Sequence, residues 1–151
     1  MATYDYLNLY RVFSSIIKSQ LGLKMIELYS NGTPPKPPYI AFDIVSPRIP
    51  NNYLEDDKVF ECVVSFTVYS KDKLEALNTC GKLRELIANQ TSRDVYEKEQ
   101  IIVVERMSVQ PRFVEETNQY AFMYGFDLRL RLVETYHEDT SFIEQINLTE
   151  N

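Results

Sequence analysis

Few residues in this chain carry the side-chain chemistry that catalysis or metal binding needs. The 151 residues include one histidine, two cysteines and four glycines. His137 lies beside Glu138 and Asp139, but no second histidine is present to complete a zinc site or an acid-base pair. The sequence therefore favours a solvated position for His137, and it predicts no catalytic residue, no metal site and no cofactor.

The other candidates for chemistry are equally poor matches to known sites. The acidic run Glu55-Asp56-Asp57 lacks the alternating ligands and the glycine of a calcium loop. The glycines, at positions 22, 32, 81 and 125, are too far apart to form a phosphate-binding loop or a dinucleotide-binding turn. We expect Cys62 and Cys80 to be reduced residues of the core. These residues point to a structural or binding role.

Hydrophobic periodicity predicts the elements of the fold. Apolar residues recur at three- and four-residue steps in 5–20 and 70–89, which predicts two amphipathic helices. Asp5 and Ser70 are the expected N-caps, and Gly22 is the expected C-cap of the first helix. Strands are predicted at 24–28, 39–45, 59–69, 101–110 and 120–132. The proline-rich stretch 30–38 and the polar stretch 90–99 are expected to be connectors.

The order of these elements, α-β-β-β-α-β-β, predicts the fold class. Because it contains no regular βαβ repetition, we expect an α+β fold: a mainly antiparallel sheet of about five strands with both amphipathic helices on one face. The expected core comprises Phe60, Val64, Phe66, Phe122, Phe126 and Leu130 of the sheet, beneath Phe13, Ile17, Leu77 and Leu83 of the helices. Residues 1–135 are predicted to form one domain, followed by an acidic tail or arm at 136–151.

Two groups of residues are candidates for protein contacts. Residues Ser46–Lys58 are predicted to form a long polar loop, which would present Arg48, Tyr53 and Leu54 to a partner. Arg129 and Arg131 lie on the polar side of the last predicted strand. Together with Arg106 and Arg112 they favour pairing with Asp127, Glu105 and Glu115, or a subunit interface, over a nucleic-acid platform.

The acidic excess is concentrated at the C-terminal end of the chain. The formal net charge is -6, and residues 134–151 hold five acids and no Lys or Arg, so the remainder is nearly neutral. A near-neutral body is poorly suited to bind DNA specifically. In the tail, Phe142, Ile143 and Ile146 would share one face of a short helix. We expect this face to dock on an adjacent subunit, on the next ring or on its own domain, or the tail to be disordered.

The sequence also predicts no membrane association. The first ten residues lack the basic and apolar regions of a signal peptide, and no segment approaches the roughly 20 apolar residues that cross a bilayer.

Several local sequences occur in a recognisable order. Pro-Pro-Tyr-Ile-Ala-Phe begins at Pro37, Phe-Glu-Cys-Val-Val-Ser-Phe-Thr-Val-Tyr begins at Phe60, and Ser-Lys-Asp begins at Ser70. An amphipathic helix precedes these segments and two long strands follow them. Over residues 5–135 this pattern resembles the tail terminator (neck) proteins of tailed bacteriophages.

The resemblance implies a structural virion protein without catalytic residues. Such a subunit forms a homo-oligomeric ring, commonly a hexamer, at the head-proximal end of the tail tube. The ring ends polymerisation of the tail tube protein and joins the tail to the head-side connector or stopper protein. DNA passes through its channel without specific binding. The implied location is the virion neck, after assembly from the host cytoplasm.

Two alternatives remain open from the sequence. The first is a head-completion, stopper or minor tail-completion subunit of the same virion. The second, from a different class, is a cytoplasmic enzyme or small-molecule-binding domain that uses carboxylates and tyrosines.

Overall fold

The computed structural model describes residues 4–28, 32–54, 57–112 and 122–134. These residues form three helices and a six-stranded mixed sheet. In chain order the elements are α1 (Leu7–Leu21), β1 (Met25–Glu27), β2 (Tyr39–Pro50), β3 (Val59–Ser70), α2 (Lys73–Leu86), α3 (Gln90–Lys98), β4 (Ile102–Arg106), β5 (Gln110–Pro111) and β6 (Phe122–Val133). The predicted α+β class is confirmed.

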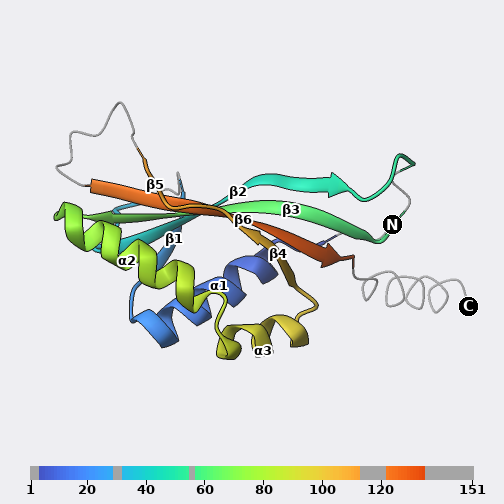
Figure 1. The fold of residues 1–151 in the computed structure, drawn as a ribbon, viewed down its shortest axis with the longest axis horizontal. Helices are drawn as coiled ribbons and strands as arrows, with labels where there is room; N and C mark the ends of the chain where they lie inside the picture. The colour runs from blue at the N-terminus through green and yellow to red at the C-terminus, as the bar shows by residue number, and fades with distance from the viewer. Residues whose placement is uncertain (1–3, 29–31, 55–56, 113–121, 135–151) are drawn as a thin grey trace, which may run out of the picture.

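The sheet has the strand order β1-β2-β3-β6-β4, and β5 also pairs with β6. All of these pairs are antiparallel except β1 with β2. The last strand, β6, therefore lies between β3 and β4 and pairs with β3 along its whole length, from Val59 opposite Val133 to Ser70 opposite Phe122. β3 and β6 form the centre of the molecule (Figure 1).

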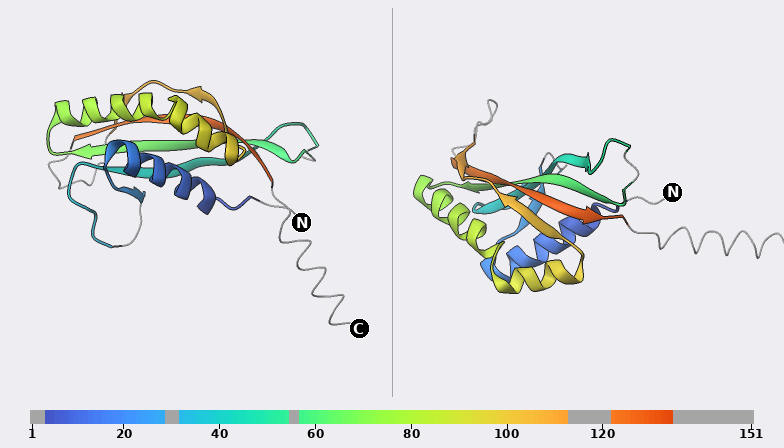
Figure 2. Two further views of the ribbon diagram at one scale, coloured as in Figure 1. Left: turned by 90° about the horizontal axis from the view of Figure 1, so that it is seen from below. Right: turned by 45° about the vertical axis from the view of Figure 1, so that its right-hand side comes forward.

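The three described helices all cover the same face of the sheet, and no described helix lies on the other face (Figures 1 and 2). The predicted apolar face of β3 is confirmed, because every second side chain from Phe60 to Val68 is completely buried. On the other face Ser65 and Thr67 are buried as well. Aromatic rings join the layers: Phe13 of α1 meets Phe66 edge-on with 5.1 Å between ring centroids, and Phe66 stacks on Phe126 of β6 at 5.6 Å. The predicted core residues Ile17, Val64, Leu83 and Leu130 are also buried.

Helix α1 is formed by the predicted apolar stripe and ends at Gly22. The glycine has a φ of 72°, and its N–H donates to the carbonyl oxygens of Ile17 and Lys18 at 3.1 Å. This left-handed conformation is accessible to glycine at little cost. The N-cap is Tyr6 rather than the predicted Asp5. Asp5 lies one residue before the N-cap, and its carboxylate accepts the N–H of Leu7.

Helix α2 differs from the prediction in its start and in its buried face. Asp72 is the N-cap and accepts the N–H of Glu75, whereas the predicted cap Ser70 is the last residue of β3. The residues that contact the core are Ala76, Cys80, Leu83 and Ile87, at helical spacing. The predicted core residue Leu77 is exposed, as is Leu74, because both lie off this stripe.

Three further expectations were wrong. Residues 90–99 were expected to be a connector but contain α3, which begins after the N-cap Asn89. Phe122 was expected in the core but is 46% exposed, because it lies at the end of the sheet opposite Ser70. The predicted strand 101–110 is interrupted, with β4 and β5 pairing separately with β6.

Candidate functional site

The β2–β3 hairpin extends beyond the body of the sheet and forms an arm (Figure 1). The predicted loop Ser46–Lys58 was too long, because β2 continues to Pro50 and pairs with Phe60 of β3. The register shifts between Ile44 and Ile49 mark bulges, which increase local strand twist. β1 pairs only with Ile40–Phe42, so this distal part of β2 is an edge, and its two prolines limit pairing with another chain.

Two apolar side chains lie at the end of the arm. Tyr53 is 97% exposed and Leu54 is 74% exposed. The base of the turn is closed by Asp57, whose carboxylate accepts the side-chain N–H of Asn51 at 2.8 Å and the backbone N–H of Val59 at 3.0 Å. These bonds, that from Val59 first, hold the pKa of Asp57 below its ordinary value. The arm therefore presents Tyr53 and Leu54 from a turn braced at its base.

Arg48, the third residue predicted in this contact region, interacts within the subunit. Its guanidinium lies 4.5 Å above the ring of Phe60 and forms an ion pair with Glu134. The hydroxyl of Tyr6 donates to the carbonyl oxygen of neighbouring Pro47 at 2.6 Å. Arg48 thus fixes the base of the arm to the end of β6, whereas Tyr53 and Leu54 are exposed at the end of the arm.

The open face of the sheet contains Arg129 and Arg131. The carboxylate of Glu61 on β3 accepts hydrogen bonds from both arginines. One oxygen accepts from Arg129, and the other accepts from Arg131 at 2.9 Å. The hydrogen bond from Arg129, and then that from Arg131, lower the pKa of Glu61 against the opposing effect of desolvation. Sequence reasoning missed Glu61 as the partner because its proximity depends on β6 lying beside β3.

Arg112 crosses the same face just after β5. Its guanidinium donates to the hydroxyl of Ser65 and to the carboxylate of Asp127, both at 2.9 Å. It passes over Gly125, where an added Cβ would lie 2.4 Å from the carbonyl oxygen of Phe66 and 3.0 Å from Arg112 Nε. Position 125 therefore accepts only glycine without a shift of backbone. The pairing of Arg112 with Asp127 follows the sequence-based expectation.

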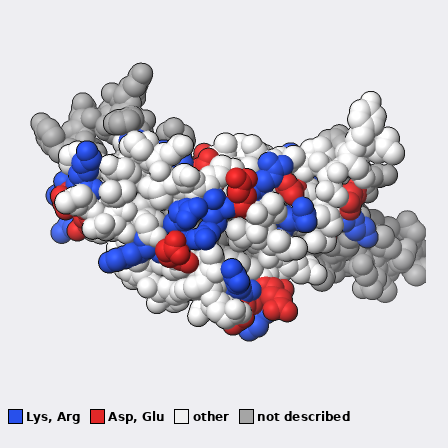
Figure 3. Space-filling view, viewed as in Figure 1, with Lys and Arg blue, Asp and Glu red and all other residues white. Residues whose placement is uncertain are grey.

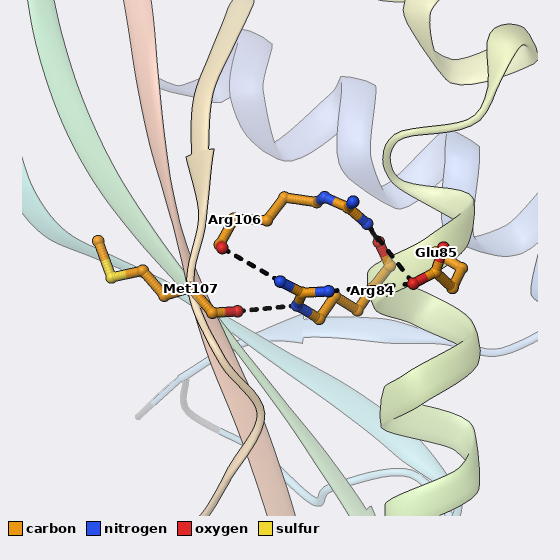
Figure 4. Close-up of polar contacts among 4 residues, drawn as sticks. All are labelled: Arg84, Glu85, Arg106 and Met107. Atoms are coloured by element: carbon orange, nitrogen blue, oxygen red, sulfur yellow. Dashed lines mark hydrogen bonds and ion pairs between the residues drawn. The ribbon is translucent and has the colours of Figure 1, made fainter.

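A reciprocal contact joins α2 to the end of β4 (Figure 4). Arg84 donates to the carbonyl oxygens of Met107 at 2.8 Å and Arg106 at 3.2 Å, and Arg106 donates back to the carbonyl oxygen of Arg84 at 2.9 Å. The carboxylate of Glu85 lies 3.9 Å from Arg84 and 3.7 Å from Arg106. Thus Glu85 lies within 4 Å of both guanidiniums, and the bonds to main-chain oxygens hold the two side chains in place.

A groove follows the free edge of β4 beside this contact. It has a volume of about 460 Å³ and is lined by Ile101–Arg106 and by α3 residues that include Arg93 and Tyr96. Ile102 is 56% exposed and Val104 is 42% exposed. Ile102 pairs with Arg131, so its side chain lies on the open face of the sheet, and what the groove offers is the unpaired edge of β4.

The described residues do not form a recognisable catalytic centre. They contain no group of three or more His, Cys, Asp or Glu side chains that could hold a metal ion. Both cysteines are buried, and desolvation raises the pKa of each thiol to about 12, which disfavours the reactive thiolate. His137 and the predicted tail residues Phe142, Ile143 and Ile146 lie outside the described residues.

Surface charge does not suggest a nucleic-acid site on the face seen in Figure 3. Lys and Arg side chains alternate there with Asp and Glu side chains, and no extended single-sign patch is visible. Of the described helices, none has the length and apolar character needed to span a bilayer.

Comparison with known proteins gives a family match and a fold match. The family model described as phage neck terminator protein matches residues 7–151. One solved structure, 15% identical in sequence, aligns with a TM-score of 0.56 over 89% of this chain and 99% of that chain. At that identity the similarity supports the fold alone. No curated protein matches the chain.

Proposed function

This chain belongs to the phage neck terminator protein family and is a structural protein of the phage tail and neck, and we propose that it acts there as a ring. The ring, a hexamer in this proposal, caps the head-proximal end of the tail tube and stops addition of tail tube protein. It also joins the tube to the head-side connector or stopper protein. The family match over residues 7–151 is the observation that carries this proposal.

The two sides of the subunit support a ring. The sheet ends in β1 and the distal part of β2 on one side, and in β4 and β5 on the other. The first side combines the three-residue β1 with the bulged part of β2, and the second combines the five-residue β4 with the two-residue β5. Contact between unlike surfaces generates a closed ring when the rotation between neighbours closes, so a head-to-tail arrangement suits this subunit.

The arm formed by the β2–β3 hairpin supplies the axial contact in this proposal. A ring uses its two sides for neighbouring copies, which leaves projecting segments for proteins above or below it. Tyr53 and Leu54 project at the end of the arm, and aromatic side chains are favoured anchors in protein interfaces. Arg48 acts indirectly, because its contacts with Phe60 and Glu134 orient the arm.

The charges are compatible with a passage for DNA. A channel that releases DNA must not hold its phosphates through uncompensated cations. Arg112, Arg129 and Arg131 are each paired with a carboxylate on the open sheet face. Two carboxylates therefore pair with three guanidiniums, because Glu61 serves both Arg129 and Arg131, so most of the positive charge of these residues is compensated within the subunit.

The test combines native mass with tube length. Light scattering and electron microscopy of the purified protein should show a ring, and adding it to polymerising tail tube protein should shorten the tubes. A monomer that leaves tube length unchanged would refute the proposal. A multimer that binds the head connector but leaves tubes unchanged would instead indicate a head-completion or stopper subunit.

A further inference from the structure

We propose that the base of the arm is a joint that sets the direction of the arm, with Tyr6 and Glu134 as its positioning residues. Tyr6 is the N-cap of α1, and Glu134 directly follows β6. The inference rests on the axial contact proposed above for Tyr53 and Leu54. It gives two residues outside the arm a part in that contact, which they play through the direction of the arm.

The strand ladder alone leaves the arm weakly directed. The register of β2 on β3 shifts between Ile44 and Ser46 and again between Ser46 and Ile49, and Pro47 and Arg48 lie within the second shift. β1 pairs only with residues 40–42 of β2, so no described strand supports the outer edge of this part. Bulges bend a strand and increase its twist. The direction in which the arm leaves the sheet therefore depends on contacts other than the ladder.

The first of these contacts comes from α1. The hydroxyl of Tyr6 donates to the carbonyl oxygen of Pro47 at 2.6 Å, within the register shift. Tyr6 is itself fixed, because its carbonyl oxygen accepts the N–H groups of Leu9 and Tyr10 in the first turn of the helix. Desolvation raises the pKa of Tyr6 above its ordinary value of 10.0, so the hydroxyl keeps its proton at neutral pH. The helix thus holds the main chain of β2 where the ladder is interrupted.

The second contact comes from the end of β6. The carboxylate of Glu134 pairs with the guanidinium of Arg48, the residue after Pro47. The N–H of Glu134 donates to the carbonyl oxygen of Lys58, which directly precedes β3, at 3.0 Å. The Glu134 side chain is 11% exposed, which limits the screening of the ion pair by solvent. Glu134 therefore ties both limbs of the hairpin to β6.

Phe60 lies at the centre of the joint. Its side chain is completely buried, with the guanidinium of Arg48 4.5 Å from the ring centroid and the ring of Tyr4 edge-on at 5.7 Å. Tyr4 in turn meets Tyr6 edge-on, with 5.3 Å between ring centroids. Cation–π and edge-to-face contacts both have preferred geometries. The contacts of Tyr6 and Glu134 therefore converge on one packed ring, and the arm cannot change direction without disturbing it.

Such a joint acts on binding through preorganisation. Tyr53 and Leu54 are exposed at the end of the arm, and they bury apolar surface only when a partner receives them. An arm that samples many directions must be restricted in each binding event, and the entropic cost lowers the affinity. Loss of the joint should therefore weaken the axial contact while the contact residues themselves are unchanged.

The distance between the arm and the body tests the joint directly. Nitroxide labels are attached to a Leu54→Cys/Asn78→Cys protein, in which both positions are exposed and the native Cys62 and Cys80 are buried. The labelled chain is diluted with unlabelled protein, so that double electron–electron resonance measures distances within one chain. We expect one narrow distance distribution.

Variants of the joint should broaden this distribution. Tyr6→Phe and Glu134→Ala each remove one contact of the joint. Tyr10→Phe is the matched control and should leave the distribution narrow, because its hydroxyl bonds to the carbonyl oxygen of Met25 in β1, at 2.9 Å. Arg48→Gln should also broaden the distribution, and Arg48→Lys, which keeps the positive charge, should restore most of its narrowness. A distribution that is equally narrow in all of these variants would overturn the joint.

Joining of heads to tails separates this inference from the proposed function. In a phage that lacks its own copy of the protein, Tyr6→Phe and Glu134→Ala should form rings but give several-fold fewer joined particles, whereas Tyr10→Phe should join normally. Normal joining by the first two variants despite a broadened distribution would overturn the positioning role and leave the ring and its axial contact intact. Normal joining by Tyr53→Ser/Leu54→Ser would instead refute the arm as the axial contact, and the positioning role with it.

Discussion

At the scale of single residues, position within β6 decides what a side chain contributes. Phe126 and Phe122 are on the same strand and the same side of the sheet, four residues apart. Phe126 is completely buried between Phe66 and the helices, whereas Phe122 lies at the strand end and is 46% exposed. The alternating pattern predicted both as core residues because periodicity defines the side of a strand, while the limits of the covering layer depend on where the helices end.

This difference gives a matched pair of substitutions. Phe126→Ala should lower the free energy of unfolding by about 3 to 5 kcal/mol, because it removes a buried ring and leaves a cavity. Phe122→Ala should lower it by less than about 1 kcal/mol. Urea denaturation of both variants makes the comparison, and equal losses would show that the packing around β6 is assigned incorrectly.

Glu61 gives a prediction about pH. Its pKa is lowered from the ordinary value of 4.5 chiefly by the hydrogen bond from Arg129, then by that from Arg131. Because the folded pKa lies below the unfolded one, the contribution to stability is complete above about pH 5 and is lost as pH falls through the folded pKa. Partial exposure of both arginines limits that contribution to about 1 kcal/mol.

The measurement is urea denaturation of the unmodified protein and of Glu61→Gln from pH 7 down to pH 3. The unmodified protein should be more stable at pH 7, and the difference should shrink below about pH 4.5 as Glu61 is protonated. Glu27→Gln, at an exposed position on β1, controls for the loss of one negative charge. A difference that grows towards acid would contradict the sign of the shift.

At the scale of elements, α3 shows how a polar sequence can encode a buried contact. Tyr96 is buried and its hydroxyl donates to the carbonyl oxygen of Ile87 at 2.7 Å. Ser92 is also buried, and its hydroxyl donates to the carbonyl oxygen of Leu86 at 2.7 Å. Hydrophobic periodicity missed this helix because hydroxyl groups anchor it. The detectable signal was Asn89, an N-cap residue directly after α2.

The substitution Asn89→Ala tests this anchoring. The side-chain oxygen of Asn89 accepts the N–H of Ser92 at 2.9 Å, and its amide donates to Gln20 of α1 at 2.6 Å. Loss of the cap and of the link to α1 should lower the free energy of unfolding by about 1 to 2 kcal/mol.

Asn78→Ala is the control, since Asn78 is an exposed residue in the interior of α2 and alanine is a better helix former. Its effect on the urea midpoint should be small or stabilising. If both variants behave alike, Asn89 does not anchor α3.

Elements with simple periodicity were predicted well, and those that depend on tertiary context were not. The extents of β3 and most of β6 follow from strict alternation. The buried face of α2 could not be predicted from hydrophobicity alone. Its sequence offers Leu74 and Leu77 as well as the smaller Ala76 and Cys80, and the smaller residues are the ones that lie in the core. Likewise, the loop sequence predicted Tyr53 and Leu54 as exposed residues, and both are exposed, but it did not predict the length of β2 that carries them outward.

At the scale of the whole molecule, the proposed function assigns folding to the body of the subunit and the axial contact to the arm. The body is stabilised by the core beneath the helices, and Arg48, Phe60 and Glu134 connect it to the arm. Tyr53 and Leu54 are the most exposed of the large apolar residues at described positions, and burying them on a partner would recover the free energy that their exposure costs.

The double variant Tyr53→Ser/Leu54→Ser should therefore separate folding from assembly. Its urea midpoint and ring formation should match those of the unmodified protein, because neither side chain contacts the core. In a phage lacking its own copy of this protein, the variant should leave heads and tails unjoined, counted by electron microscopy. The control is Leu74→Ser, which removes an exposed leucine from α2. Supplied to the same deficient phage, this variant should give joined heads and tails. Normal particle numbers with the double variant would show that the end of the arm is not the axial contact, while a lowered midpoint would show that it stabilises the subunit instead.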